Sequence, residues 1–327
     1  MYSPTADVIA ETFALGEPVA DLVLVRRGDT DTWRLETATG AYFVKGYWSS
    51  TGGQSTAGGL TDQLAAAMAF EDRARAAGID LAEPIAPVDP TLGWVKQINE
   101  RLFRVYRWIE HRPLEDDDDI ADWLGRTMAQ VHQLEPLGAA GLPDWWRTAL
   151  RPRADWEKWF TTAREQGKEW ADLGWDRLPQ IVELTDRIRE ACEFAPDCTL
   201  THGDFKTHNL LITGTGPILV DWDSVRTDSA ALEAGRVAYI FGAGEPEPIS
   251  RILTAYTAAG GDLTWAGHDV FLSEARHDLH ILFEHVLTCL GHIPQPRWMT
   301  TPDQTTATLL SEFPAKLTRL QDAAVQL

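Results

Sequence analysis

The first third of the chain has the pattern of several short strands and one helix. Apolar and β-branched residues gather in short segments separated by turn residues, which is typical of antiparallel strands. Five such segments are present: residues 22–27, 33–37, 42–47, 93–98 and 101–108. A helix is predicted from Thr61, which can cap it, to about Ala77, because Gly78 follows as a stop signal. The pattern therefore predicts a small antiparallel sheet with one helix.

Helical periodicity dominates the rest of the chain, with one interruption. The acidic run 115–119 is predicted to open a helix that continues to about Leu134, because carboxylates stabilise the first turn of a helix. Residues 199–224 break the helical pattern. Within them, two apolar segments at 210–212 and 218–220 predict a β-hairpin. The second, larger part of the protein is therefore expected to be mostly helical.

Oxygen-bearing side chains flank this hairpin. Asp204 is followed five residues later by Asn209, and Asp221 comes at the end of the second apolar segment. Carboxylate and amide oxygens in this arrangement suit Mg²⁺ and phosphoryl transfer. We expect Asp204 to accept the proton of an acceptor hydroxyl and Asn209 with Asp221 to hold Mg²⁺. The alternative is that they are ordinary turn residues, and their joint spacing argues against it.

Two lysines are candidates for binding phosphate groups. Lys45 ends a predicted strand, where it could neutralise nucleotide phosphates, and Lys206 follows Asp204 by two residues. The turn at Gly28 would either cradle phosphates through backbone amides or serve only as a hairpin turn. His208 would either pin the loop through a backbone hydrogen bond or carry a proton.

Composition and charge limit the classes of partner. Lys and Arg total 29 against 49 Asp and Glu, so the formal charge is −20. Because binding to nucleic acid needs clustered basic residues, a nucleic-acid partner is not expected. The acidity either attracts cationic small molecules or only maintains solubility. No apolar run is long enough to span a membrane, and the first residues lack the basic and apolar regions of a leader, so we expect a cytoplasmic protein without a membrane partner. The cysteines show no metal-binding pattern.

Two segments carry a resemblance to a known family. Residues 202–209, HGDFKTHN, and 220–223, VDWD, match the patterns HGDxxxxN and IDxx. On these segments the sequence resembles an aminoglycoside phosphotransferase-type kinase, a family related to protein kinases. Segments 43–45, 106–110 and 131–134 are also similar to that family.

The resemblance implies an α+β, bilobal protein-kinase-like fold, with a small antiparallel-sheet N-lobe and a larger, mostly helical C-lobe. It places the N-lobe at 1–107, a hinge at about 106–110 and the C-lobe at 111–327. The phosphate donor would be ATP or GTP with Mg²⁺. The hinge backbone at Tyr106, Trp108 and Ile109 would bind the nucleotide base.

The resemblance also implies residue roles. Asp204 corresponds to the catalytic base, Asn209 and Asp221 to the magnesium ligands, and Lys45 to the phosphate-binding lysine. Glu233 stands where the family usually has an Asp that braces the catalytic loop. The carboxylate that pairs with the lysine would be Asp62 or Glu71, and Asp223 would be either a further metal or substrate contact or a solvated turn residue.

Several aromatic and histidine residues allow two interpretations. The tryptophans between Trp145 and Trp175 would either stack on a ligand or pack the interior, and packing is favoured. His277, His280 and His285 lie near helical spacing, but without a matching carboxylate pattern we expect solvated or core histidines rather than a metal site.

Three functions are compatible with these residues. The first is a kinase that phosphorylates a hydroxyl of an aminoglycoside or aminocyclitol antibiotic. The second is a metabolic kinase that acts on a sugar, an amino alcohol or homoserine. The third is an inactive kinase-like binding module, which is disfavoured because no expected catalytic residue is missing.

Overall fold

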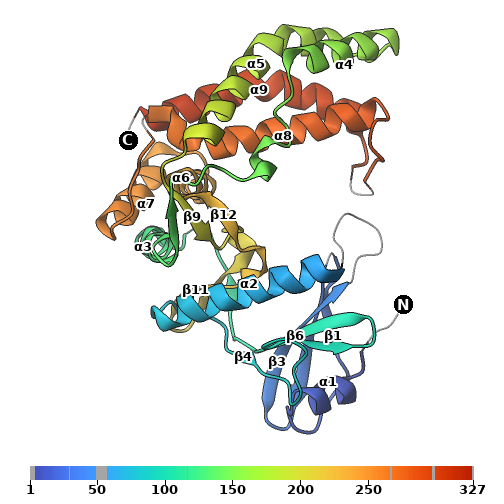
Figure 1. Cartoon of the computed structure of the whole chain (residues 1–327), viewed down its shortest axis with the longest axis vertical. Coiled ribbons are helices and arrows are strands. Elements are labelled where there is room, and N and C mark those ends of the chain that lie inside the picture. The colour runs from blue at the N-terminus through green and yellow to red at the C-terminus, as the bar shows by residue number, and fades with distance from the viewer. Residues whose placement is uncertain are drawn as a thin grey trace. The chain divides into compact units, whose positions relative to one another are not determined.

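The protein is described by a computed structural model of residues 4–28, 30–48, 57–115, 117–265, 267–296 and 299–325. It forms two compact units (Figure 1). The first unit consists of Met1–Asp118 and His202–Val225, and the second of Asp119–Thr201 and Arg226–Leu327.

An antiparallel sheet forms the centre of the first unit. Its strands have the order β1-β2-β3-β6-β4, and β5 also pairs with β6. The elements are α1 (Ala6–Thr12), β1 (Val23–Arg26), β2 (Thr30–Thr37), β3 (Gly40–Trp48), α2 (Ala57–Ala76), β4 (Pro84–Ile85), β5 (Lys96–Ile98) and β6 (Arg101–Arg107). The predicted small antiparallel sheet with one long helix is therefore present.

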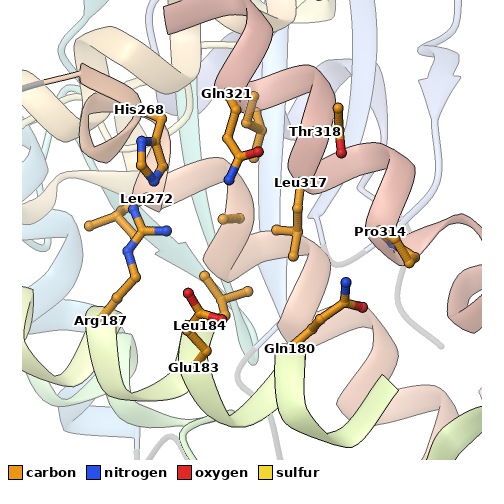
Figure 2. A pocket seen from close by; sticks show the side chains of 12 residues that line it. Gln180, Glu183, Leu184, Arg187, His268, Leu272, Pro314, Leu317, Thr318 and Gln321 are labelled. Atoms are coloured by element: carbon orange, nitrogen blue, oxygen red, sulfur yellow. The ribbon is translucent and has the colours of Figure 1, made fainter. Parts of the chain in front are cut away.

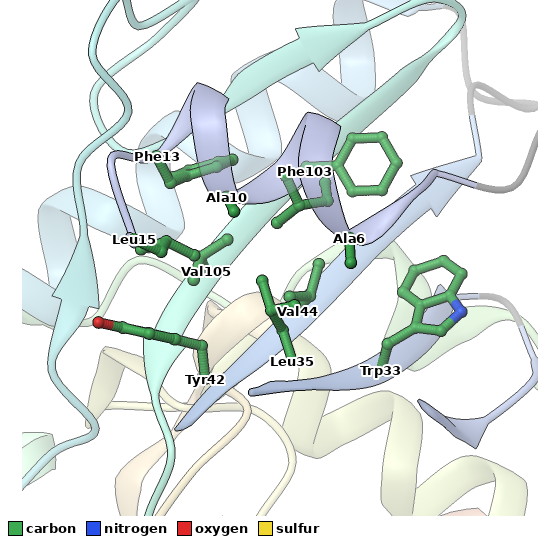
Figure 3. Close-up of a cluster of buried hydrophobic side chains, with 11 residues drawn as sticks. Ala6, Ala10, Phe13, Leu15, Trp33, Leu35, Tyr42, Val44, Phe103 and Val105 are labelled. Carbon is green, nitrogen blue, oxygen red and sulfur yellow. The ribbon is translucent and has the colours of Figure 1, made fainter. Parts of the chain in front are cut away.

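The two faces of this sheet pack against different helices. Since side chains of a strand alternate between faces, Trp33, Val44 and Phe103 lie on one face, where they form a core with Phe13 and other residues in and after α1 (Figure 3). On the opposite face, Tyr47 packs against residues of α2. Lys45 shares the face of Tyr47, which directs it away from the α1 core.

A second, three-stranded sheet belongs to the same unit. It has the order β11-β10-β7 and includes the predicted hairpin. Its elements are β7 (Arg112–Pro113), β10 (Leu210–Thr213) and β11 (Gly216–Leu219), and the short 3-10 helices η2 (Thr207–Asn209) and η3 (Trp222–Ser224) flank the hairpin. Because β10 pairs with β7, residues 202–225 group with the N-terminal part of the chain, whereas the expected division at 107–111 assigned them to the C-terminal part.

The second unit is mostly helical. A three-stranded sheet, β12-β9-β8, lies among its helices (Figure 1). Its elements are α3 (Ala121–His132), β8 (Pro136–Gly138), η1 (Asp144–Arg147), α4 (Arg153–Glu165), α5 (Ala171–Phe194), β9 (Cys198–Thr201), β12 (Arg226–Ser229), α6 (Ala230–Phe241), α7 (Pro246–Ala258), η4 (Gly267–Phe271), α8 (Leu272–Cys289) and α9 (Pro302–Ala324). Trp146, Trp156 and Trp170 are buried in it, which confirms packing as the role of these three tryptophans. The predicted combination of a small antiparallel-sheet part and a larger helical part is thus confirmed.

Two predicted helix starts differ from the structure. The helix predicted to start at Thr61 begins four residues earlier, at Ala57. The helix expected from residue 115 begins at Ala121, because Asp118 accepts hydrogen bonds from Arg112 and from the backbone N–H of Glu115 and so closes a turn. Asp116 of that acidic run lies outside the described residues.

Candidate active site

Lys45 is the buried cation at the centre of the candidate site. It lies on β3 and is only 6% exposed. Its Nζ donates a hydrogen bond to Asp221 Oδ1 at 2.5 Å and forms an ion pair with Asp223. Burial lowers the pKa of Lys45, but the two carboxylates more than offset this, so the pKa lies above its usual value. The lysine is therefore charged and ready to bind an anionic group.

The turn after β11 brings both aspartates to this lysine. Asp221 adopts a left-handed conformation with φ 67° and ψ 58°, which Asp tolerates better than most residues. Trp222 between them is buried, and its ring lies 6.0 Å from that of Phe70 and 4.8 Å from that of His202. The buried ring anchors the turn, and the backbone reversal directs the flanking carboxylates to the same side.

A chain of alternating charges connects Lys45 to α2. Asp223 accepts hydrogen bonds from Tyr47 and from Arg104 Nη1, each at 2.6 Å. The other terminal nitrogen of Arg104 pairs with Glu71 at 2.5 Å, and both of these side chains are 1% exposed. Burial alone would raise the pKa of Asp223. Lys45 and Arg104 lower this pKa by more than burial raises it, so it lies at about 2. Asp223 is therefore a buried ionised carboxylate and not a solvated turn residue.

Neither of the two expected partners, Asp62 and Glu71, forms an ion pair with Lys45 in the described residues. Within the described residues, Lys45 pairs with Asp221 and Asp223, while Glu71 pairs with Arg104. Asp62 lies on an exposed part of α2. The physical reason is that Arg104 stands between Glu71 and Asp223, so the link between the lysine and α2 passes through a second cation.

His202 fixes the loop that carries Asp204. It is fully buried, its Nε2 lies 3.1 Å from the carbonyl oxygen of Val220, and its Nδ1 accepts a hydrogen bond from the backbone N–H of Asp204. Since Nδ1 accepts, Nε2 carries the proton and donates to Val220. The ring thereby ties the loop to the strand that leads into Asp221.

Asp204 and Asn209 are directly hydrogen-bonded. The amide Nδ2 of Asn209 donates to the backbone carbonyl and to Oδ2 of Asp204, both at 2.9 Å. Lys206 pairs with the other carboxylate oxygen at 2.5 Å. Burial raises the pKa of Asp204, but Lys206 and Asn209 bring it below its usual value, so the carboxylate is ionised at neutral pH.

The same arrangement fits a magnesium ion. With Nδ2 of Asn209 turned towards Asp204, its amide oxygen is the atom left to bind a cation, and Asp221 contributes a half-exposed carboxylate. Mg²⁺ is commonly held by one or two such oxygen ligands together with phosphates and water. Two protein ligands are therefore sufficient here.

Most of the predicted site residues line one cavity of about 310 Å³. Those that line it are Lys45, Tyr106, Trp108, Ile109, His208, Asn209, Asp221 and Asp223. Asp204, Lys206 and Gly28 are not among its lining residues. An added Cβ at Gly28 would meet only the Thr30 carbonyl oxygen at 3.8 Å, so the backbone there has no local need for glycine.

Some backbone N–H groups of the predicted hinge are already hydrogen-bonded within the protein. The N–H of Trp108 donates to the Ala41 carbonyl at 2.9 Å and that of Arg107 to the Glu83 carbonyl at 2.8 Å. His111 Nδ1 lies 2.7 Å from the Ile109 carbonyl oxygen. A nucleotide base would therefore have to use other groups of this segment than the Arg107 and Trp108 donors.

Comparison with known proteins assigns the chain to a family. Residues 22–270, which make up most of the chain, match the phosphotransferase enzyme family, abbreviated APH. The chain belongs to this family. The predicted resemblance to aminoglycoside phosphotransferase-type kinases is thereby confirmed.

Individual relatives of this chain are distant. A probable ketoamine kinase of Vibrio parahaemolyticus is 25% identical over 169 residues, which cover 48% of this chain and 56% of that protein. The structure of an aminoglycoside phosphotransferase from Alicyclobacillus acidocaldarius superposes with a TM-score of 0.64 at 12% identity, covering 96% of each chain. That of a spectinomycin phosphotransferase with ADP and spectinomycin gives 0.57 at 14% identity, covering 100% of each. The two structural similarities show the fold alone.

The second unit contains a buried group of hydrogen-bonded side chains that the sequence pattern indicated only in part. Glu233 accepts hydrogen bonds from His132 Nε2 at 2.8 Å and from the Thr201 hydroxyl. His132 Nδ1 in turn faces the Tyr256 hydroxyl at 3.0 Å. Thr201 directly precedes the segment 202–209, so Glu233 holds the strand that leads into it. Sequence reasoning missed the roles of His132 and Tyr256, although the segment 131–134 carried a family signal.

A smaller cavity of about 160 Å³ lies between α5, α8 and α9 (Figure 2). Gln180, Arg187 and Thr318 are among its lining residues, and none of the predicted site residues is. Arg187 is paired with Asp269.

Two further findings concern metals and membranes. In the described part of the chain, no group of three or more His, Cys, Asp or Glu side chains is arranged to hold a metal ion. His280 instead pairs with Glu284 at 3.4 Å, and His285 is buried. No helix among the described residues has the length and apolar character needed to cross a membrane.

Proposed function

We propose that this chain transfers the γ-phosphate of ATP to a hydroxyl group of a small molecule in a magnesium-dependent reaction. The observation that carries the proposal is the hydrogen-bonded pair of Asp204 and Asn209 together with the ion pair of Asp221 and Lys45. The presence of Asn209, Asp221 and Lys45 around one cavity supports a common role in binding a nucleotide.

Each residue has a defined part in this reaction. The ionised Asp204 orients the acceptor hydroxyl and takes its proton as the oxygen attacks the γ-phosphorus. The bond from that phosphorus to the oxygen bridging it to the β-phosphate then breaks, and ADP leaves. Lys45 neutralises phosphate charge, and Asn209 and Asp221 are the ligands for Mg²⁺. The metal, when bound, stabilises the charge that develops on the phosphates.

The acceptor has two candidate classes, each with its own support. An aminoglycoside or aminocyclitol is supported by the family and by the net charge of −20, which favours cationic molecules. A metabolic hydroxy compound is supported by the match to a probable ketoamine kinase.

A coupled ADP-release assay tests the proposal. The acceptor panel should contain aminoglycosides, spectinomycin, sugars, amino alcohols and hydroxy acids, each with Mg²⁺ and ATP. We expect one class to raise ADP release above the rate without acceptor, and Asp204→Asn to abolish this increase. If no acceptor raises ADP release above that of Asp204→Asn, the proposal is wrong.

A further inference from the structure

Hydrogen-bond donors without acceptors surround the indole of Trp145 in the second unit. The guanidinium carbons of Arg226 and Arg276 lie over this ring, 4.4 and 4.6 Å from its centroid. They come from different elements, since Arg226 belongs to β12, Arg276 to α8 and Trp145 to η1. Among the residues that the structure describes, the Nε atoms of both arginines and Nε1 of Trp145 are buried without a hydrogen-bond partner.

Arg276 shows the energetic cost of this arrangement. It is only 9% exposed. Burial lowers the pKa of Arg276 to about 10, and repulsion from Arg226 acts in the same direction, while Asp228 opposes it. Burying a guanidinium without a matching acceptor is unfavourable, and two of them at one ring also repel each other. A bound anion would relieve both effects.

The carboxylates nearest to the arginines are already engaged. Asp228 Oδ1 accepts hydrogen bonds from Trp146 Nε1 and from the backbone N–H of Ser229, both at 2.9 Å. Burial and repulsion from Glu233 raise the pKa of Asp228, while Arg226 and Arg276 lower it. Glu233 is held by His132 and Thr201.

We propose that Arg226 and Arg276, with the indole N–H of Trp145, bind an oxyanion, namely the carboxylate or phosphate group of a small molecule. The planar donor fork of arginine matches both groups.

A binding experiment tests the anion site without relying on activity. The full chain is saturated with magnesium and ADP so that the nucleotide site is occupied, and inorganic phosphate or acetate is titrated at constant ionic strength. The midpoint of thermal unfolding should rise with added anion, because a ligand of the folded state stabilises it. The phosphate and acetate arms distinguish the two kinds of oxyanion.

Three variants make this experiment specific. Arg226→Met and Arg276→Met should weaken the apparent anion affinity by roughly tenfold or more, as expected for loss of a charge-assisted contact. Arg189→Met, which removes an exposed arginine of the same unit, should leave it unchanged. Arg226 is only half-buried, so its variant provides the test if Arg276→Met does not fold. The proposal is overturned if neither anion stabilises the wild type, or if Arg226→Met responds like wild type.

Discussion

At the scale of single residues, the most informative group is Arg104 between two carboxylates. It pairs with Asp223 on one side and with Glu71 on the other, and all three are largely buried. Removing one member of a buried ionic network leaves the others uncompensated, which costs about 3–5 kcal/mol. This network links the turn of Asp221 to α2.

We therefore expect Arg104→Met to lower the free energy of unfolding by about 3 kcal/mol or more, measured by urea denaturation. Arg107→Met is the matched control, because Arg107 lies on the same strand, is half-exposed and pairs with the exposed Glu83. Its effect should stay below about 1 kcal/mol, as for other surface ion pairs. Equal losses in the two variants would contradict the importance of the network.

The pKa of Asp223 leads to a prediction about pH. Because its pKa in the folded state is lowered to about 2, ionised Asp223 stabilises the fold at pH values above that of an unfolded Asp, near 4. This stabilisation is lost as the pH falls from about 4 to about 2 and amounts to roughly 2 kcal/mol.

The measurement compares the free energy of unfolding of wild type and Asp223→Asn from pH 6 to pH 2. The difference between the two proteins should be largest above pH 5 and shrink towards pH 2. A difference that stays constant over this range would show that Asp223 is not a buried ionised group.

Sequence reasoning found the residues of the motif but not those that support it. Asp204, Asn209 and Asp221 lie within eighteen residues, so their spacing alone suggested a common chemistry. The Arg104 network joins residues 33 and 119 positions apart and depends on strand register. The sequence of β6 nevertheless indicated that Arg104 is buried. The alternation of side chains along a strand places this charged residue on the same face as the apolar Leu102.

At the scale of elements, the contact between α3 and α7 depends on a glycine. A Cβ at Gly125 of α3 would come within 2.6 Å of the Tyr256 backbone nitrogen and closer still to the Ile252 carbonyl oxygen. Alanine normally stabilises a helix relative to glycine by roughly 0.5–1 kcal/mol. In this position the overlap with α7 should reverse the sign.

We expect Gly125→Ala to lower the free energy of unfolding by about 1–3 kcal/mol, in the range of overpacked interiors. The measurement is the urea midpoint of the full chain. Gly214→Ala is the control, because nothing lies within 4 Å of an added Cβ there. If Gly125→Ala is as stable as wild type or more stable, the close packing of α3 on α7 is contradicted.

Some elements followed from the sequence, whereas α1 and the shortest strands did not. The predicted strand at 42–47 corresponds to Gly40–Trp48 and the predicted helix at 61–77 to Ala57–Ala76. The two four-residue strands of the predicted hairpin, β10 and β11, are also present. α1 and the two-residue strands β4 and β7 were missed. α1 spans only seven residues, and strands of two residues carry no periodicity, so both depend on tertiary packing.

At the scale of the whole molecule, the charge of −20 opposes the approach of an anionic nucleotide. Salt screens such long-range repulsion, with a Debye length of about 10 Å at 0.1 M ionic strength. The association rate constant of a fluorescent Mg²⁺–ADP analogue, measured by stopped flow, should therefore rise as sodium chloride increases from 10 to 200 mM. A steep fall would show that local basic groups dominate the field.

The central claim, phosphate transfer that depends on Asp204, is tested most directly by following the γ-phosphate itself. Wild type is incubated with γ-labelled ATP, Mg²⁺ and the acceptor identified by the panel, and the label in the acceptor is measured by mass spectrometry. Asp204→Asn should reduce the transfer rate by about 10²–10⁴-fold while nucleotide binding is kept, as for loss of a general base. Asp186→Asn, at an exposed position of α5, should transfer at the wild-type rate. Transfer by Asp204→Asn at the wild-type rate would contradict the account.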